Sequence, residues 1–278
     1  MKLYFNVLLE FDTGIVNETI EQAIKANKKG YVCAMESNNL AIANTNGRFM
    51  GIVNRALINI CDGSNVAWLL GRIHKKKFHS YTGSSIFQHF ISLKKYHHYF
   101  LGNTLPVLNS LRENLSKTDP RIDEMPFCEL PFREVEKFDY QQIADAINAD
   151  APDIIWVSLG APKQELFMSK LCPYLRKGIM LGVGAVFNFA SKTGPIKRAP
   201  EWMRNLRLEW LYRAFEEPKK NIPRYWKFLT VLPRLVVQEM YKKNERLIYM
   251  TLASVFLDGN YFDGNVKCQE KEENKVFS

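Results

Sequence analysis

The sequence predicts an α/β fold with a mostly parallel sheet, followed by a basic helical segment. Apolar runs that suit strands covered on both faces alternate along the chain with helix-like segments. Basic and aromatic residues gather in one stretch after Gly194. The 278 residues are 46% hydrophobic and 24% charged, which is typical of a globular chain and excludes disorder and low-complexity fibres. The length allows one large domain, or one domain of about 200 residues with an appendage.

We expect the chain to begin with a strand and a helix. Residues 1–12 (MKLYFNVLLEFD) hold a short apolar run that Asn6 interrupts and acidic residues end, with no small-residue cleavage site. They therefore predict a first strand and not a signal peptide. Asn17 can act as the N-cap of a helix that carries Ile20 and Ala23 on its apolar face. Gly30 is expected to end this helix.

Five further apolar runs are predicted to be strands: Gly30–Met35, Ala56–Cys61, Tyr96–Gly102, Asp153–Leu159 and Gly178–Gly184. Asp139 forms a capping box with Gln142 and so begins a helix directly before the fourth of these runs. Strands that alternate with helices indicate βαβ units with right-handed crossovers.

The residues after Gly194 differ from the rest of the chain. Residues 197–246 carry 13 Lys or Arg and 6 Asp or Glu, with aromatic residues between them, and account for +7 of the formal net charge of +9. Three interpretations remain open: helices whose aromatics pack on the sheet, a surface for phosphate headgroups, or a nucleic-acid face, although no nucleic-acid-binding motif supports the last. We expect a core over residues 1–196, a basic aromatic appendage over 197–246, and a tail over 247–278.

Cysteine usage and hydropathy restrict the compartment and the membrane relationship. The five Cys are scattered and form no CxxC pair, which favours a reducing cytosol over disulfides or a zinc site. The apolar runs Phe228–Val237 and Leu247–Leu257 are too short to span a bilayer. We therefore expect a soluble protein or one that lies on a membrane surface.

Four loops that follow predicted strands could carry chemistry, because ligands of open α/β sheets bind at the carboxyl ends of the strands. Asp62-Gly63 offers a general base beside a glycine that lets a ligand approach. Gly102-Asn103 precedes a helix near Pro106 whose N–H groups could bind phosphate. The other two loops are Gly160–Glu165, with Lys163 and Gln164 as donors, and Gly182–Ala185. Together they predict a nucleotide site.

Several enzyme classes are disfavoured by missing motifs. No Walker lysine follows a glycine loop, no GxSxG elbow is present, and the five His show no HExxH spacing. No DxD-like acidic pair follows a strand, and we expect Asp62 to stand without a neighbouring carboxylate. A metal-dependent sugar transferase would need such carboxylates to hold Mg²⁺ or Mn²⁺.

Three long segments carry a family resemblance: Val157–Phe167 (VSLGAPKQELF), Gly182–Phe189 (GVGAVFNF) and Lys197–Lys220 (KRAPEWMRNLRLEWLYRAFEEPKK). They resemble the WecG/TagA/CpsF glycosyltransferase family, and Asp62-Gly63, Leu101-Gly102 and Pro131-Phe132 agree with its shorter motifs. Order and spacing match from about Gly30 to Arg224.

The resemblance implies a Rossmann-like core with a C-terminal helical appendage that docks on the cytoplasmic face of the cell membrane. It implies inverting, metal-independent transfer from a UDP-sugar to a polyprenyl-diphosphate-linked saccharide, as in teichoic-acid or exopolysaccharide synthesis. The sugar would be N-acetylmannosamine or a related hexose or uronic acid. A nucleic-acid partner and a cofactor are not expected.

Matching motifs suggest roles for individual residues. Asp62 corresponds to the family's proposed catalytic base, and Gln164 is the second expected catalytic residue, which would bind the substrate. The remaining expected substrate-binding residues are Gly63, Gly102, Asn103, Gly160, Lys163, Glu165, Gly184, Arg198, Arg207 and Arg213. The resemblance suggests that the three arginines meet the diphosphate, where bidentate guanidinium groups suit the charge.

Two departures from the family pattern affect the expected donor. The family has Asp where this chain has Asn188, and its usual threonine falls near Ala34, so that a hydroxyl is missing or displaced to Ser37. Two other functions remain open from the residues alone. One is a dinucleotide-dependent oxidoreductase, which lacks its GxGxxG motif, and the other is a non-catalytic protein that binds anionic membranes or nucleic acid.

Overall fold

The computed structural model describes residues 1–193 and 198–258, and side chains as far as residue 244. Residues Met1–Glu239 form one compact unit, and a second unit begins at Met240. The predicted start of the appendage at Lys197 and residues 259–278 of the predicted tail lie outside the described residues.

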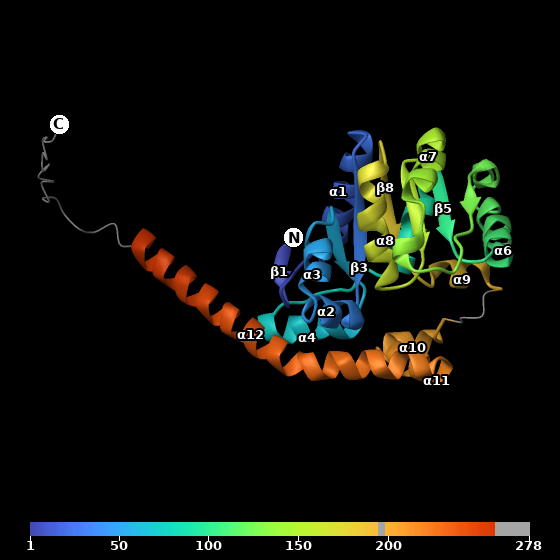
Figure 1. Cartoon of the computed structure of the whole chain (residues 1–278). Coiled ribbons are helices and arrows are strands. Elements are labelled where there is room, and N and C mark those ends of the chain that lie inside the picture. The colour runs from blue at the N-terminus through green and yellow to red at the C-terminus, as the bar shows by residue number, and fades with distance from the viewer. Residues whose placement is uncertain (194–197, 259–278) are drawn as a thin grey trace, which may run out of the picture. The chain divides into compact units, whose positions relative to one another are not determined.

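The first unit contains a six-stranded, fully parallel sheet in the order β4-β3-β8-β7-β5-β6, which confirms the predicted α/β fold (Figure 1). Five of these strands coincide with the predicted apolar runs: β3 (Lys29–Met35), β4 (Ile58–Cys61), β5 (His98–Gly102), β7 (Ile154–Ser158) and β8 (Gly178–Gly182). The edge strand β6 (Phe127–Cys128) was not predicted, because two residues are too few to show a pattern.

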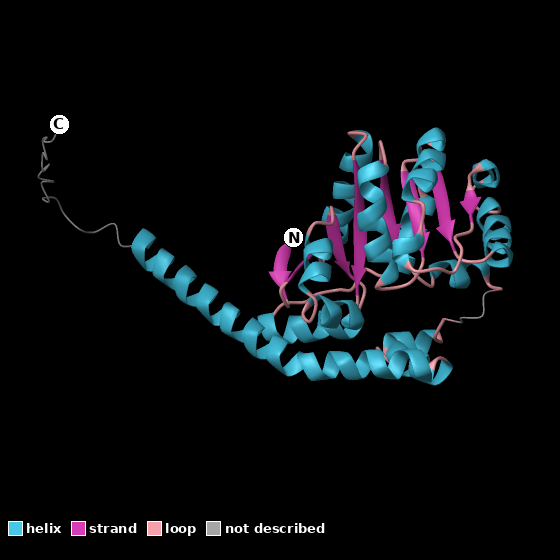
Figure 2. Cartoon of the chain, viewed as in Figure 1, coloured by secondary structure: helices cyan, strands magenta, loops and turns pink. Residues whose placement is uncertain are grey.

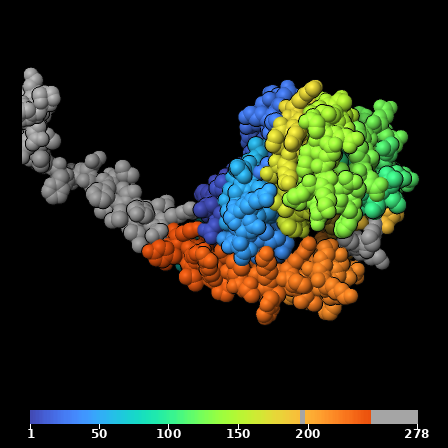
Figure 3. Space-filling model, viewed as in Figure 1, coloured from blue at the N-terminus to red at the C-terminus, as the bar shows by residue number. Residues whose placement is uncertain are grey.

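Helices cover both faces of this sheet (Figure 2). Alternate residues of each strand enter separate cores: Cys33 and Val157 pack with α3, α7 and α8, whereas Val32 and Trp156 pack with α1, α5 and α6. The period of two thus explains why the strands are continuously apolar. Helix α8 contacts both α3 and α7 on its face (Figure 3).

The helices have the following bounds: α1 (Thr13–Lys25), α2 (Ser37–Ala43), α3 (Gly47–Asn54), α4 (Ser64–His74), α5 (Gly83–Ser92), α6 (Leu105–Ser116), α7 (Tyr140–Asp150), α8 (Lys163–Leu171), α9 (Val186–Ser191), α10 (Glu201–Asn205), α11 (Glu209–Glu216) and α12 (Pro218–Asp258). Short 3₁₀ turns lie at η1 (Pro120–Glu124), η2 (Val135–Lys137) and η3 (Cys172–Tyr174).

The N-terminal prediction was wrong in three respects. Helix α1 ends at Lys25 with Ala26 as its C-cap, and Gly30, which was expected to end it, lies within β3. Residues 1–12 form a hairpin of β1 (Lys2–Tyr4) and β2 (Val7–Leu9), because Phe5 and Asn6 both adopt positive φ and turn the chain. Helix α1 begins one turn before Asn17, since the carboxylate of Asp12 already accepts the N–H groups of Gly14 and Ile15. The predicted cap at Asp139 is confirmed by its bond from the N–H of Gln142 (2.9 Å).

Residues 198–239 contain α10, α11 and the first part of α12, joined by short turns, and pack on the core of the first unit. Glu239 is 1% exposed, and its carboxylate accepts the N–H of Phe5 (2.8 Å) and pairs with His74 (2.9 Å). Arg224 donates to the carbonyl of Ala161 (3.1 Å) in the loop before α8. Within the part of the chain that the structure describes, every helix is too short or too polar to cross a membrane.

Candidate active site

The carboxyl ends of the parallel strands bring the predicted loops to one edge of the sheet. Asp62 follows β4, Gly102 and Asn103 end and follow β5, Gly160 follows β7, and Gly184 follows β8. Residues from four separate regions of the sequence thus lie along one edge of the sheet because their strands run in the same direction, with β3, β8 and β7 between the ends of β4 and β5.

Asp62 is a partly buried carboxylate at the end of β4. Its Oδ1 accepts the N–H of Gly83 at the start of α5 (3.0 Å), which fixes the side chain. Burial raises its pKa to about 6, against the lowering effects of the Gly83 N–H and Arg213, while Glu36 and Glu209 raise it further. At neutral pH the group is ionised yet basic enough to accept a proton from a reacting hydroxyl.

Gly63 lets the chain turn close to the end of β3. A Cβ on this glycine would lie 3.2 Å from Cγ2 of Val66 and 3.7 Å from Cα of Glu36. The β4–α4 turn therefore packs against the segment that leaves β3, and this contact brings Glu36 beside Asp62.

Glu36 corrects the expectation that Asp62 has no carboxylate neighbour. The register pairs Met35 with Cys61, and the N–H of Asp62 continues the ladder by donating to the carbonyl of Met35 (3.0 Å). The residues that follow the two strands are therefore neighbours, although 26 positions separate them. The sequence shows that an acidic residue follows each of these two strands. Only the pairing of β3 with β4 shows that the two acidic residues are neighbours.

Gln164 locks the loop after β8 against α8. Its Oε1 accepts the N–H of Gly184 (3.0 Å), and its Nε2 donates to Oε1 of Glu165 (3.0 Å). A Cβ at Gly182 would lie 2.9 Å from this Nε2, so the close approach requires glycine. The side chain is 3% exposed, and its hydrogen bonds are mostly satisfied within the protein.

Glu165, which was expected to bind substrate, is fully buried. Its Oε1 also accepts from Nδ2 of Asn39 (3.1 Å), a residue of α2 that sequence reasoning missed. Burial raises the pKa of Glu165 to about 7, whereas the bonds from Gln164 and Asn39 lower it. Oε2 of Glu165 and Oδ1 of Asn39 are buried without a hydrogen-bond partner among the described residues, which favours a proton on this carboxyl group.

Asn103 connects the ends of β5, β7 and β8. It adopts φ +69°, and its Nδ2 donates to Oγ of Ser158 (3.2 Å), which in turn donates to the carbonyl of Gly184 (2.7 Å). Gly102 has φ +98°, and a Cβ there would lie 2.8 Å from the carbonyl oxygen of Ser158. These loops form a rigid floor on which a nucleotide could lie.

Lys163 and Gly160 border this floor. Nζ of Lys163 lies 5.0 Å from the ring centre of Phe132 and 5.4 Å from that of Phe138, so the ammonium group is held by aromatic faces. Gly160 has φ +73°, and a Cβ there would meet no atom within 4 Å. Open space at this glycine leaves room for a ligand beside the loop.

Arg198 and Arg213 lie within electrostatic reach of Asp62, and Arg204 lies within reach of Arg198. Arg213 donates to Oε1 of Glu209 through Nε (3.3 Å) and Nη2 (3.1 Å). Loss of hydration lowers the pKa of Arg198, and the charges of Arg204 and Arg213 lower it further, while Glu209 and Asp62 oppose this shift. Nε of Arg204 is buried and lacks a hydrogen-bond partner among the residues described. Crowded guanidinium groups with a free donor suit a bound anion.

Arg207 occupies a different place from the other predicted arginines. Its side chain is exposed and its φ is +60°. The residue contacts the core through its backbone carbonyl, which accepts a 3.5 Å bond from Asn65. Arg204, which the motif comparison did not single out, joins Arg198 and Arg213 instead.

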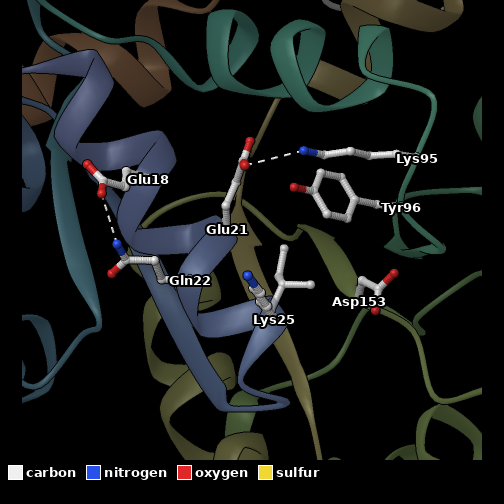
Figure 4. Close-up of a pocket in the computed structure, with 8 residues that line it drawn as sticks. Glu18, Glu21, Gln22, Lys25, Lys95, Tyr96 and Asp153 are labelled. Carbon is white, nitrogen blue, oxygen red and sulfur yellow. Dashed lines mark hydrogen bonds and ion pairs between the residues drawn. The ribbon is translucent and has the colours of Figure 1, made fainter.

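A cavity of about 530 Å³ lies at the opposite, amino end of the strands (Figure 4). Its lining includes Glu21, Lys25, Lys95 and Asp153, and Glu21 pairs with Lys95 at 3.2 Å. The lining carries three acidic and two basic side chains, and none of the predicted strand-end loops reaches this cavity.

Among the described side chains of residues 1–193 and 198–244, no group of three or more His, Cys, Asp or Glu is placed to hold a metal ion. Cys33 and Cys61 are buried, and Cys128 and Cys172 are partly buried, all with free thiols.

Residues 8–246 match the model of the glycosyl transferase WecG/TagA/CpsF family. The chain belongs to this family. It is therefore a glycosyltransferase, as the motifs predicted, and the strand-end residues described above lie within the matched region.

Three curated relatives share the printed name N-acetylglucosaminyldiphosphoundecaprenol N-acetyl-beta-D-mannosaminyltransferase. The protein of Bacillus spizizenii is 25% identical over 84% of this chain and 87% of its own length. Those of Bacillus subtilis and Staphylococcus aureus are 24% and 26% identical, over 84% and 73% of this chain and 91% and 82% of their own lengths.

The two residues that depart from the family pattern, Ala34 and Asn188, lie in β3 and in α9, the helix that follows β8. Ala34 is 8% exposed within β3, and Asn188 is 9% exposed within α9. The hydroxyl of Ser37 donates to Oε2 of Glu36 (3.2 Å), so it serves the local turn.

Proposed function

We propose that this glycosyltransferase transfers a sugar of the N-acetylmannosamine type, or a related hexose or uronic acid, from a UDP-sugar to a polyprenyl-diphosphate-linked saccharide. The relatives are named for transfer of N-acetylmannosamine to an undecaprenyl-diphosphate-linked acceptor, which supports the substrate class. The observation that carries the proposal is the half-buried carboxylate of Asp62, within the electrostatic reach of Arg213, at the ligand-binding edge of the sheet.

Asp62 would act as the general base of a single displacement. Its carboxylate takes the proton of the acceptor hydroxyl while that oxygen forms a bond to the anomeric carbon. The bond between the anomeric carbon and the phosphate oxygen breaks at the same time, and UDP leaves with the electron pair. Attack from the face opposite the leaving group inverts the configuration at the anomeric carbon.

Arginines would offset the charge that develops on UDP, without a divalent ion. Arg198 and Arg213 lie within electrostatic reach of Asp62, Arg204 lies within reach of Arg198, and Nε of Arg204 has no hydrogen-bond partner among the described residues. Fixed cations at a leaving group stabilise its negative charge in the transition state.

The acceptor lipid would be reached at the cytoplasmic face of the membrane. Large side chains of residues 198–239 are exposed: Trp202 (61%), Leu206 (63%), Phe215 (77%), Ile222 (56%) and Trp226 (69%). Lys219, Lys220 and Lys227 lie among them in the sequence. Aromatics mixed with lysines suit an anionic lipid surface.

Vesicle binding tests this membrane role. With phosphatidylglycerol vesicles, Trp226→Ser is expected to weaken binding about 3- to 10-fold, because an apolar side chain no longer enters the interface. Ile15→Ser, at a 47%-exposed residue of α1, is the matched control and should leave binding unchanged. Equal losses in the two variants would contradict the proposed surface.

A donor and acceptor screen tests the activity. The chain is incubated with individual UDP-sugars and a synthetic polyprenyl-diphosphate-linked N-acetylglucosamine, and released UDP is measured with and without EDTA. We expect UDP release that depends on the acceptor and survives EDTA. Absence of turnover with every UDP-sugar, or turnover abolished by EDTA and restored by Mg²⁺, would contradict the corresponding part of the proposal.

A further inference from the structure

Two acidic residues follow the paired strands β3 and β4. The parallel pairing of Met35 with Cys61 and the bond from the N–H of Asp62 to the carbonyl of Met35 make Glu36 and Asp62 neighbours, and a Cβ on Gly63 would lie 3.7 Å from Cα of Glu36. The fold thus brings a second acidic residue next to the proposed base.

The side chain of Glu36 is held in place. It caps α2, and its Oε2 accepts the N–H of Asn38 (3.1 Å) and the hydroxyl of Ser37 (3.2 Å). Local hydrogen bonds therefore fix a charged group that is only partly exposed. Its charge acts on three neighbours from different elements, namely Asp62 after β4, Glu165 in α8 and Tyr225 in α12.

Charges of both signs face Asp62. The N–H of Gly83 and the guanidinium of Arg213 favour its ionised form, and Arg198 lies within electrostatic reach. Glu36 and Glu209 act in the opposite direction, as does burial, and the neighbouring thiol of Cys61 is buried and un-ionised at neutral pH. Glu209 already pairs with Arg213, so Glu36 is the acidic neighbour with no arginine partner among the ion pairs of the described residues.

We propose that Glu36 is a positioning residue of the active site, whose carboxylate keeps Asp62 basic by opposing the cations that bind the diphosphate. This inference rests on the proposed role of Asp62 as the base. A site that holds a diphosphate needs arginines, and arginines make a neighbouring carboxylate a weaker base. A fixed second carboxylate at the end of β3 offsets this effect, so that one site can bind anions and still remove a proton.

The experiment measures the pH dependence of kcat/KM in Glu36→Gln. Removing the charge should lower the pKa of Asp62, so the acid limb of the profile should move down by about 0.5 to 1 pH unit. The plateau should fall about 3- to 10-fold, because the weaker base removes a proton less effectively. Glu113→Gln, an exposed residue of α6, removes the same charge elsewhere and should leave the profile unchanged.

Two further variants separate charge from capping. Glu36→Asp keeps a carboxylate at the N-cap, so the acid limb of its kcat/KM profile should lie close to that of the wild type. Glu36→Asn removes the charge but keeps a preferred N-cap residue. Its acid limb should therefore move as in Glu36→Gln, and it remains a valid test if Glu36→Gln folds poorly. A ¹³C NMR titration of the Asp62 carboxyl carbon, assigned with Asp62→Asn, gives the same pKa change without substrate.

The outcomes distinguish this inference from the proposed function. An unshifted acid limb and an unshifted Asp62 titration in both neutral variants would overturn the role of Glu36, while loss of turnover in Asp62→Asn would leave the base assignment intact. Wild-type turnover in Asp62→Asn would overturn both.

Discussion

The strand ends of the core and the helices of residues 198–239 contribute different chemistry to the candidate site. Core side chains are held by backbone groups of distant segments, as Gln164 is by Gly184 and Asp62 by Gly83. Arg213 in α11 has a local partner instead, Glu209, one turn before it. The core therefore supplies positions that the sheet fixes, whereas the helices supply charge on long side chains.

This difference teaches how the two tasks of a glycosyltransferase can be divided. Proton removal requires a base at hydrogen-bond distance from one hydroxyl, and burial against fixed N–H groups achieves this. Diphosphate binding tolerates longer, more adjustable side chains, because Arg–phosphate contacts are strong over a range of approaches. Exposed aromatics are concentrated in the same helices, so lipid contact and anion binding would be supplied by one part of the chain.

Loss of the core base should have the largest effect. We expect Asp62→Asn to lower kcat/KM about 10²- to 10⁴-fold, since a neutral amide cannot take the acceptor proton. The amide oxygen can still accept the N–H of Gly83, so the thermal midpoint of unfolding should be preserved. UDP release under initial-rate conditions is the measurement, and Asp123→Asn, an exposed residue of η1, is the control. An equal loss in both variants would remove the special position of Asp62.

The arginine cluster should be sensitive to the shape of the cation as well as its charge. Arg213→Lys is expected to lower kcat/KM for the UDP-sugar about 10- to 100-fold, because an ammonium group loses the planar pair of donors. Arg207→Lys, at an exposed side chain outside the cluster, should change it less than about 3-fold. Steady-state kinetics with varied donor measure both. A large loss of kcat/KM in Arg207→Lys would show that the diphosphate site also includes Arg207.

The buried acid of the core should appear in the pH dependence of stability. Its folded pKa, about 7, lies above the ordinary value of 4.5, so protonated Glu165 stabilises the fold at low pH and this contribution is lost as pH rises through 7. Glu165→Gln is therefore expected to be more stable than the wild type at pH 8, by about 1 to 3 kcal/mol, and equally stable near pH 4.5.

Urea unfolding at the two pH values measures this difference. The amide of Glu165→Gln also supplies a donor next to the unpaired Oδ1 of Asn39, which acts in the same direction. Glu201→Gln in the exposed α10 is the matched control and should show no pH-dependent gain. A stability difference that is the same at both pH values would mean that Glu165 is ionised in the folded state.

Much of the core was predictable because its signals are local or continuous. Runs such as Ile154–Ser158 are apolar on both faces, and each was correctly assigned to a strand, since few alternatives bury so many side chains. Helix boundaries were harder to predict where the sequence offers two N-cap residues. Asp12 is the N-cap of α1, although Asn17 has a similar side chain. The hairpin turn at Phe5-Asn6 carries no glycine, so its positive φ values were not visible in the sequence.

The sequence by itself determined the α/β class, the strand-end loops and the identity of Asp62 and Gln164 as candidates, because periodicity, caps and motifs depend on neighbouring residues. Only the tertiary structure decided that Glu36 adjoins Asp62, that Asn39 reaches Glu165, and that Arg204 joins Arg198 and Arg213. Such contacts depend on the register of paired strands and on where helices pack, and those are set by the burial of the whole core.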